Sequence, residues 1–272
     1  MALGFSVEAL LPAARVRGPL RMGLVRIAET EWLQAEPDLA VRAAHFDRHP
    51  DSVDIRPEAE AAGRELAAML GVAGGLEAAA RSVWEDLCLL TRDAEGQPWR
   101  LTGAAVAFPT DWRLAEKMGR PLLDVHQPIH GYAEQLSEAV DRFMNGLEPG
   151  AIFGRTNAFV VASDDLRYRP EADPAARFAH VTAANAGETL YVRCERETLR
   201  CLPDSGAIVF TIGIYRAPLG SLSDIGVARI AQTLEGFGAI AGEGEHERRA
   251  APHYAAALAG YAATRAGEKR AA

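Results

Sequence analysis

The sequence of 272 residues predicts an α+β fold, in which one antiparallel sheet of about five strands has flanking helices at both ends. Three observations lead to this prediction. Amphipathic, charged stretches lie near the beginning and the end of the chain. Apolar, β-branched or aromatic stretches separated by turn residues fill the middle. Strands do not alternate with helices in the βαβ rhythm of a parallel sheet, which disfavours a Rossmann or barrel enzyme.

The first elements are helices followed by a strand pair. Apolar residues recur at spacings of three and four in Glu29–Gln34 and Arg56–Leu70, which is typical of amphipathic helices. Val83–Leu90 and Trp99–Phe108 are strand-like. The residues between these strands favour a hairpin connection and include Asp93, Gly96 and Pro98.

A helical insertion follows the strand pair. Trp112–Met118 is a short helix-prone stretch, and Tyr132–Leu147 has the pattern of a longer amphipathic helix. Between them, the prolines and glycine of Pro121–Gly131 predict an ordered turn or loop rather than regular structure.

Three further strands complete the sheet. They are expected at Ala151–Ala162, Thr189–Arg200 and Ala207–Tyr215, and turn residues join the last two. Helices are expected at Ser223–Phe237 and Tyr254–Arg265.

The domain prediction follows from this order. Residues 1–240 are expected to form a single domain with a helical N-terminal extension. Residues 241–272 are expected to form a tail that is helical or partly disordered, because its small side chains bury little area.

Composition disfavours several classes of partner. The chain has 37 acidic and 29 basic residues and a formal net charge of -8, which opposes binding to nucleic acid or anionic membranes. No apolar run reaches the roughly 20 residues that cross a bilayer, and arginines interrupt the first 25 residues, so we expect neither a membrane span nor an export signal. The three cysteines form no CxxC pair, which favours the reducing cytoplasm over a disulfide framework.

Two separated blocks of sequence resemble the haem-dependent oxidative N-demethylase family, and weaker matches extend the resemblance over about residues 15–235. The first block comprises Leu101–Trp112, Leu114–Pro121 and Val125–Pro128; the second comprises Arg193–Pro203, Ser205–Ala207 and Phe210–Ile212. The resemblance implies a PAS-like sheet that holds haem b. It also implies an enzyme that uses O2 to oxidise a methyl group of a small secondary amine such as dimethylamine, with release of formaldehyde.

The expected electron source is a separate protein. The chain has no nicotinamide-binding glycine motif, no flavin signature and no ferredoxin-type cysteine run. A haem-dependent oxygenase of this kind therefore requires a separate reductase protein that carries flavin, iron–sulfur clusters or both. Self-association of the chain stays open.

The resemblance implies that His126 is the axial ligand of the iron, for which a neutral imidazole is suited. From spacing alone, a histidine that is merely hydrogen-bonded in a loop is favoured. His130 follows four residues later and is the alternative ligand, a distal residue or simply an exposed one. Basic residues that match the family are candidates for binding the haem propionates, namely Lys117, Arg120, Arg155 and Arg196.

A protonated amine requires a carboxylate or an aromatic face in its pocket. Glu195 is the candidate catalytic carboxylate, and the alternative is a structural ion pair with Arg193 or Arg196 on the same strand. Glu85 and Asp86 are the reserve candidates.

Two departures from the family pattern concern pocket-lining positions. His130 stands where a small apolar residue or proline is usual, and Ala158 stands where an aromatic residue is expected. These departures leave the substrate less well supported than haem binding. Because a fold does not determine a function, two other functional classes stay open: a PAS-like haem sensor without turnover, and a non-catalytic partner subunit.

Overall fold

The computed structural model describes residues 3–14, 20–129, 131–240 and 249–271, so His130 lies outside the described residues. The chain forms two compact units. The first consists of residues 1–2, 20–155 and 196–213, and the second of residues 3–19, 156–195 and 214–272. The single domain expected for residues 1–240 stays a prediction.

Within the described residues the sheet is antiparallel, which confirms the predicted α+β class, but it has seven strands instead of about five. Their order is β1-β5-β6-β7-β3-β4-β2. The strands are β1 (Val25–Ile27), β2 (Val53–Ile55), β3 (Asp86–Thr91), β4 (Arg100–Ala105), β5 (Ile152–Val161), β6 (Tyr191–Cys201) and β7 (Ile208–Pro218). The two additional strands, β1 and β2, have three residues each and lie at the edges of the sheet, too short to show a period of two.

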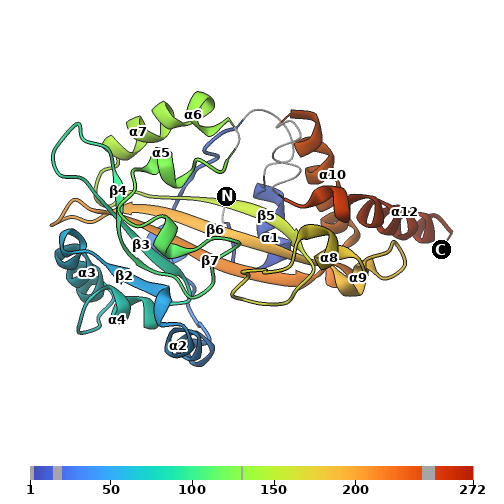
Figure 1. Cartoon of the computed structure of the whole chain (residues 1–272), viewed down its shortest axis with the longest axis horizontal. Helices are drawn as coiled ribbons and strands as arrows, with labels where there is room; N and C mark the ends of the chain where they lie inside the picture. The colour runs from blue at the N-terminus through green and yellow to red at the C-terminus, as the bar shows by residue number, and fades with distance from the viewer. Residues whose placement is uncertain (1–2, 15–19, 130, 241–248, 272) are drawn as a thin grey trace. The chain divides into compact units, whose positions relative to one another are not determined.

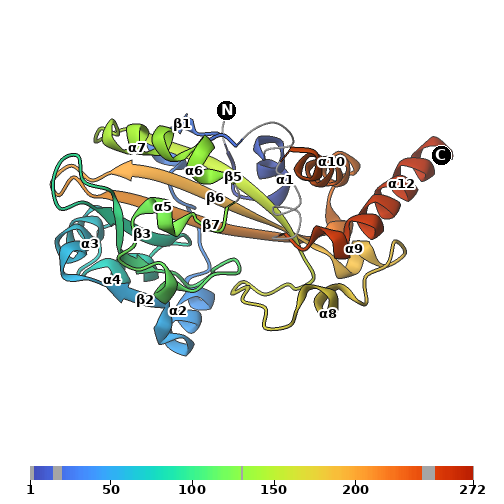
Figure 2. The ribbon, with the colours of Figure 1, turned by 45° about the horizontal axis from the view of Figure 1, so that its top comes forward.

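Helices of the first unit cover both faces of its strands (Figures 1 and 2). A Cβ added to Gly103 would meet Ala59 and Leu76, so this side of β4 faces α3 and α4. Cys88 and Ala104 lie on the other face, in an apolar cluster with residues of α5 and α7. The helices of this unit are α2 (Leu39–Arg48), α3 (Pro57–Met69), α4 (Leu76–Arg81), α5 (Leu122–Val125), α6 (Tyr132–Gln135) and α7 (Ser137–Asn145).

Two local predictions in this unit were wrong. Pro121–Gly131 contains the one-turn helix α5, because proline disfavours helix only beyond the first turn and Pro121 lies at the N-cap. The expected helix Tyr132–Leu147 is divided into α6 and α7 at Leu136, whose φ of -124° is not helical.

The second unit is mainly helical beside its strand segments. Its helices are α1 (Val7–Leu10), α8 (Pro174–Phe178), α9 (Ala186–Thr189), α10 (Asp224–Ile240) and α12 (Ala255–Ala271). Helices α10 and α12 pack together, and the ring of buried Tyr254 lies 4.8 Å from that of Phe178. No helix within the described ranges has the length and apolar character that crossing a membrane requires.

Candidate functional site

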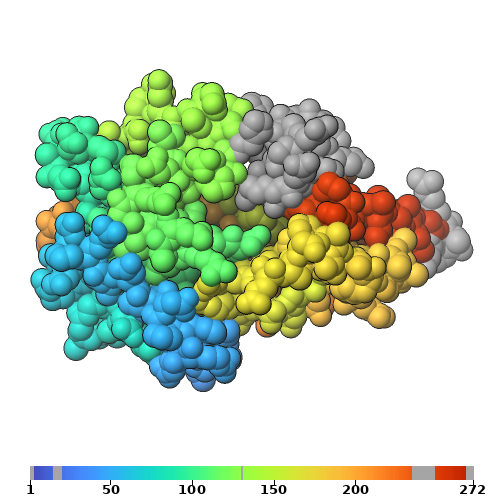
Figure 3. Space-filling view, viewed as in Figure 1, coloured from blue at the N-terminus to red at the C-terminus, as the bar shows by residue number. Residues whose placement is uncertain are grey.

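His126 lies at the C-cap of the one-turn helix α5. Figure 3 shows that the chain segment around this helix, coloured green, lies at the surface. Its backbone N–H donates to the carbonyl oxygen of Leu122 at 3.1 Å. The ring Nδ1 lies 2.8 Å from the same oxygen. Because a carbonyl only accepts hydrogen bonds, Nδ1 carries the proton, and the lone pair is on Nε2. This is the tautomer in which a histidine binds metal through Nε2.

The imidazole is neutral over the physiological pH range. The pKa of His126 is lowered to about 4, mainly by burial. The hydrogen bond to the Leu122 carbonyl raises this pKa, and the positive charges of Lys117 and Arg155 lower it. A neutral ring is the form that has a lone pair for a metal.

In the haem-free protein, we expect NMR titration of His126 to give a midpoint near pH 4 rather than the ordinary value of about 6.5. The folded-state pKa is depressed, so the unfolded chain binds this proton first. The free energy of unfolding should therefore decrease as the pH falls from about 6.5 to about 4. A midpoint near 6.5 would contradict the burial of the ring.

Lys117 connects this helix with the segment before it. Its Nζ donates to the carbonyl oxygen of Val125 at 2.8 Å and lies 5.4 Å from the centre of the Trp112 ring. The last carbonyls of a helix have no partner within it, so this contact stabilises the C-terminal end of α5. It also places a cation beside His126.

Arg155, near the middle of β5, supplies the second cation. Its Nε lies 3.1 Å from Oε2 of Glu197 on β6. Sequence reasoning missed Glu197. The charge pattern of β6 could have indicated it. Glu197 directly follows Arg196, and successive side chains of a strand point to opposite faces, so only one of the two can meet a given side chain of the neighbouring strand.

Apolar side chains lie in the segments near His126. Trp112, Val125 and Phe153 are partly buried against the apolar cluster. Leu123 of α5 is 48% exposed. It lies three residues before His126, a spacing at which helical side chains are neighbours. The neighbourhood of His126 thus combines apolar side chains with the charges of Lys117 and Arg155.

The structure brings His126, Lys117 and Arg155 together, but not the other two basic candidates. Arg120 is exposed, and its side chain makes no hydrogen bond or ion pair to the described residues. Arg196 is fully buried and donates to the carbonyl oxygens of Glu31 and Trp32, the latter at 3.0 Å.

Glu195 belongs to the second unit and is 8% exposed. Its carboxylate makes no ion pair within the described part of the chain. Arg193, one of the two partners considered above, donates to the carbonyl oxygens of Asp165 and Leu166 at 3.1 and 2.9 Å.

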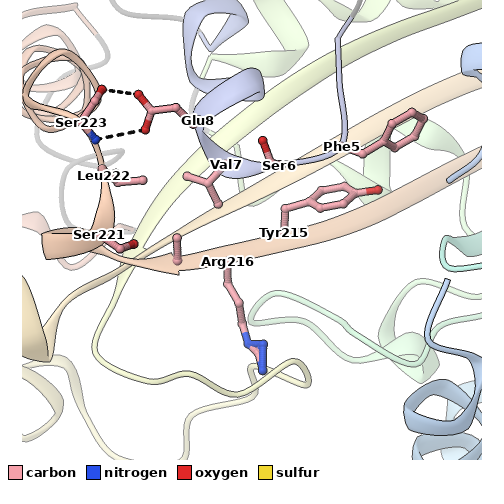
Figure 4. Close-up of a pocket in the computed structure, with 10 residues that line it drawn as sticks. Phe5, Ser6, Val7, Glu8, Tyr215, Arg216, Ser221, Leu222 and Ser223 are labelled. Carbon is pink, nitrogen blue, oxygen red and sulfur yellow. Dashed lines mark hydrogen bonds between the residues drawn. The ribbon is translucent and has the colours of Figure 1, made fainter. Parts of the chain in front are cut away.

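The second unit also has a pocket of about 470 Å³ between α1 and the end of β7 (Figure 4). The rings of Phe5 and Tyr215 meet edge to face, with 6.3 Å between their centres. The Glu8 carboxylate accepts from the N–H of Ser223 at 3.3 Å and from its hydroxyl. This carboxylate therefore caps the beginning of α10, which gives it a structural role.

In the described residues, no three His, Cys, Asp or Glu side chains gather as they do around a metal ion held by side chains alone. A haem iron needs one axial donor from the protein rather than three, so a haem site does not require such a group.

Comparison with known proteins supports the earlier resemblance. A search of curated proteins gave no match. The family model "Haem-dependent oxidative N-demethylase, alpha subunit-like" matches residues 72–243, which is more than half of the chain and includes α5, β5 and β6. The chain therefore belongs to the haem-dependent oxidative N-demethylase alpha subunit-like family.

Proposed function

We propose that this chain is the haem-binding subunit of an oxidative N-demethylase, with His126 as the axial ligand of haem b. The observation that carries the proposal is the hydrogen bond between Nδ1 of His126 and the Leu122 carbonyl, which leaves Nε2 of a neutral ring as the donor atom. The family supports haem dependence.

The residues around His126 fit a haem. The porphyrin is a large apolar group, and the apolar surface of Leu123, Val125 and Trp112 suits its faces. The cations of Lys117 and Arg155 suit the two propionates. Arg120 stays a candidate through its exposure, whereas the carbonyl partners of Arg196 favour a structural role for its guanidinium.

The protein's own part in the reaction is binding and orientation. When bound, haem supplies the O2 chemistry that oxidises the methyl group of a small N-methylated amine, with formaldehyde as the product. His126 would hold the iron, and its Nδ1–H bond to the Leu122 carbonyl would keep the ring in one orientation.

The carboxylate of Glu195 is proposed to bind the protonated amine. Its burial without an ion pair to the described residues supports this role, because a buried carboxylate is costly unless a cation or hydrogen-bond donors satisfy it. A small secondary amine carries both a positive charge and N–H donors.

Electrons are proposed to come from a separate reductase with flavin, iron–sulfur clusters or both. The words "alpha subunit-like" in the family description support an assembly of several subunits. A cytoplasmic location and a PAS-like character of the sheet are parts of the same proposal, and the three free, buried cysteines are compatible with that location.

The decisive experiment is a product assay. The purified chain should show a Soret band after haem reconstitution. With a reductase system and O2, it should release formaldehyde from dimethylamine in proportion to reductant consumed. Glu195→Gln should reduce kcat/KM for the amine while the Soret band is retained. Haem binding without formaldehyde release from any small N-methylamine would support a sensor and contradict the enzyme.

A further inference from the structure

The ring of Tyr132 lies parallel to the imidazole of His126. Their centres are 4.5 Å apart, and the ring planes differ by 12°. Tyr132 is 4% exposed, so its ring is held by the surrounding protein. Neither composition nor spacing pointed to this tyrosine, because five residues separate it from His126 in the sequence.

Two successive turns bring the tyrosine over the histidine. The N–H of Ile129 donates to the His126 carbonyl at 2.8 Å, and the N–H of Tyr132 donates to the Ile129 carbonyl at 3.1 Å. Gly131 is the N-cap of α6, and its φ of 76° lies in the left-handed region that favours glycine. The Tyr132 carbonyl then accepts from the N–H of Leu136 at 2.9 Å.

Stacking on Tyr132 restricts a ring rotation of His126 that the hydrogen bond to Leu122 does not restrict. The contact between Nδ1 and the Leu122 carbonyl selects the tautomer, but a single hydrogen bond tolerates a range of ring angles about the Cβ–Cγ bond. An aromatic ring at 4.5 Å and nearly parallel blocks that rotation, because turning would drive the imidazole into the Tyr132 face.

We propose that Tyr132 is a positioning residue that sets the plane of the His126 ring, and so the plane in which Nε2 meets the haem iron. The inference rests on the proposed function for its link to haem, but the orientation of the ring is a property of the haem-free chain. Residues that orient a metal-binding histidine change metal affinity by about 10- to 100-fold when they are replaced.

Three variants separate the parts of this role. Tyr132→Phe keeps the aromatic face and removes the hydroxyl, Tyr132→Leu removes the face, and Phe143→Leu is the matched control. Phe143 packs edge to face on Phe153, with ring centres 5.1 Å apart. We expect Tyr132→Leu to transfer haem to an apoglobin scavenger about tenfold faster. Its cyanide-bound ferric form should give a broadened low-spin EPR signal. Tyr132→Phe and Phe143→Leu should resemble the wild type in both measurements.

NMR of the haem-free wild type tests the geometry without a variant, and so remains decisive if Tyr132→Leu fails to fold. The ring protons of His126 should show upfield ring-current shifts and cross-peaks to the Tyr132 ring. Absence of both would overturn the proposal, as would a Tyr132→Leu protein with wild-type EPR line shape and transfer rate. A chain that fails to bind haem yet shows these NMR contacts would refute the proposed function while leaving the ring orientation established.

Discussion

Replacing His126 with alanine is expected to abolish the Soret band of the reconstituted protein, or to lower haem affinity by more than about 100-fold. The reason is the loss of the only donor atom that the described site offers to iron, Nε2 of a neutral imidazole. Loss of a ligand must cost more than loss of a residue that only orients one. Haem titration followed at the Soret maximum measures the effect.

Two further variants distinguish a lost ligand from a disturbed fold. His126→Gly leaves space for a free imidazole, so adding imidazole should restore the Soret band if the ring acts as a ligand. His180→Ala is the matched control, because His180 is exposed and belongs to the second unit. It should bind haem like the wild type.

His130 provides the competing outcome. If His126→Ala keeps a normal spectrum and His130→Ala loses it, the axial ligand is His130 and the assignment to His126 is wrong. If both single variants keep the spectrum, the iron has another donor.

The fold was predictable where long strands and turn residues coincide, and less so at short elements. The predicted strand Ala151–Ala162 agrees closely with β5, and Thr189–Arg200 agrees with β6 within two residues. Strands β1 and β2 are stabilised by pairing with β5 and β4, a tertiary effect that three residues of sequence do not reveal.

The sequence predicted some residues of the candidate site, but not the tyrosine that local turns bring to it. The family resemblance pointed to Lys117, His126 and Arg155, which the fold brings together. Alternation along β6 explains why Arg196 lies elsewhere, since Glu197 is the residue that faces Arg155. Tyr132 depends on two consecutive turns and a left-handed glycine, which sequence patterns of period two or 3.6 do not describe.

The second large effect is expected at Asp86, which ties the strand pair to the segment that leads to the site. Its Oδ1 lies 3.0 Å from Nη1 of Arg42 and accepts from the N–H of Ala107 at 2.7 Å. Its Oδ2 accepts from the N–H of Phe108 at 3.0 Å. Arg42 and Asp86 are both fully buried.

Asp86→Ala should lower the free energy of unfolding by about 3–5 kcal/mol, because it leaves the Arg42 cation without its counter-charge and removes the acceptor of two buried N–H groups. The guanidinium keeps its bonds to the carbonyl oxygens of Trp84 and Glu85, which should prevent a larger loss. Denaturant titration measures the change.

Asp47→Ala is the matched control, since Asp47 also pairs with an arginine, Arg81, at 2.8 Å but is exposed. An exposed pair contributes about 0–1 kcal/mol, so the two aspartates should differ several-fold in cost although their ion-pair distances are similar. Hydrogen exchange locates the effect: in Asp86→Asn, the amides of Ala107 and Phe108 should exchange faster than in the wild type. Equal losses of stability in Asp86→Ala and Asp47→Ala would show that burial does not decide the strength of the Arg42 pair, and that the segment before His126 is held by other contacts.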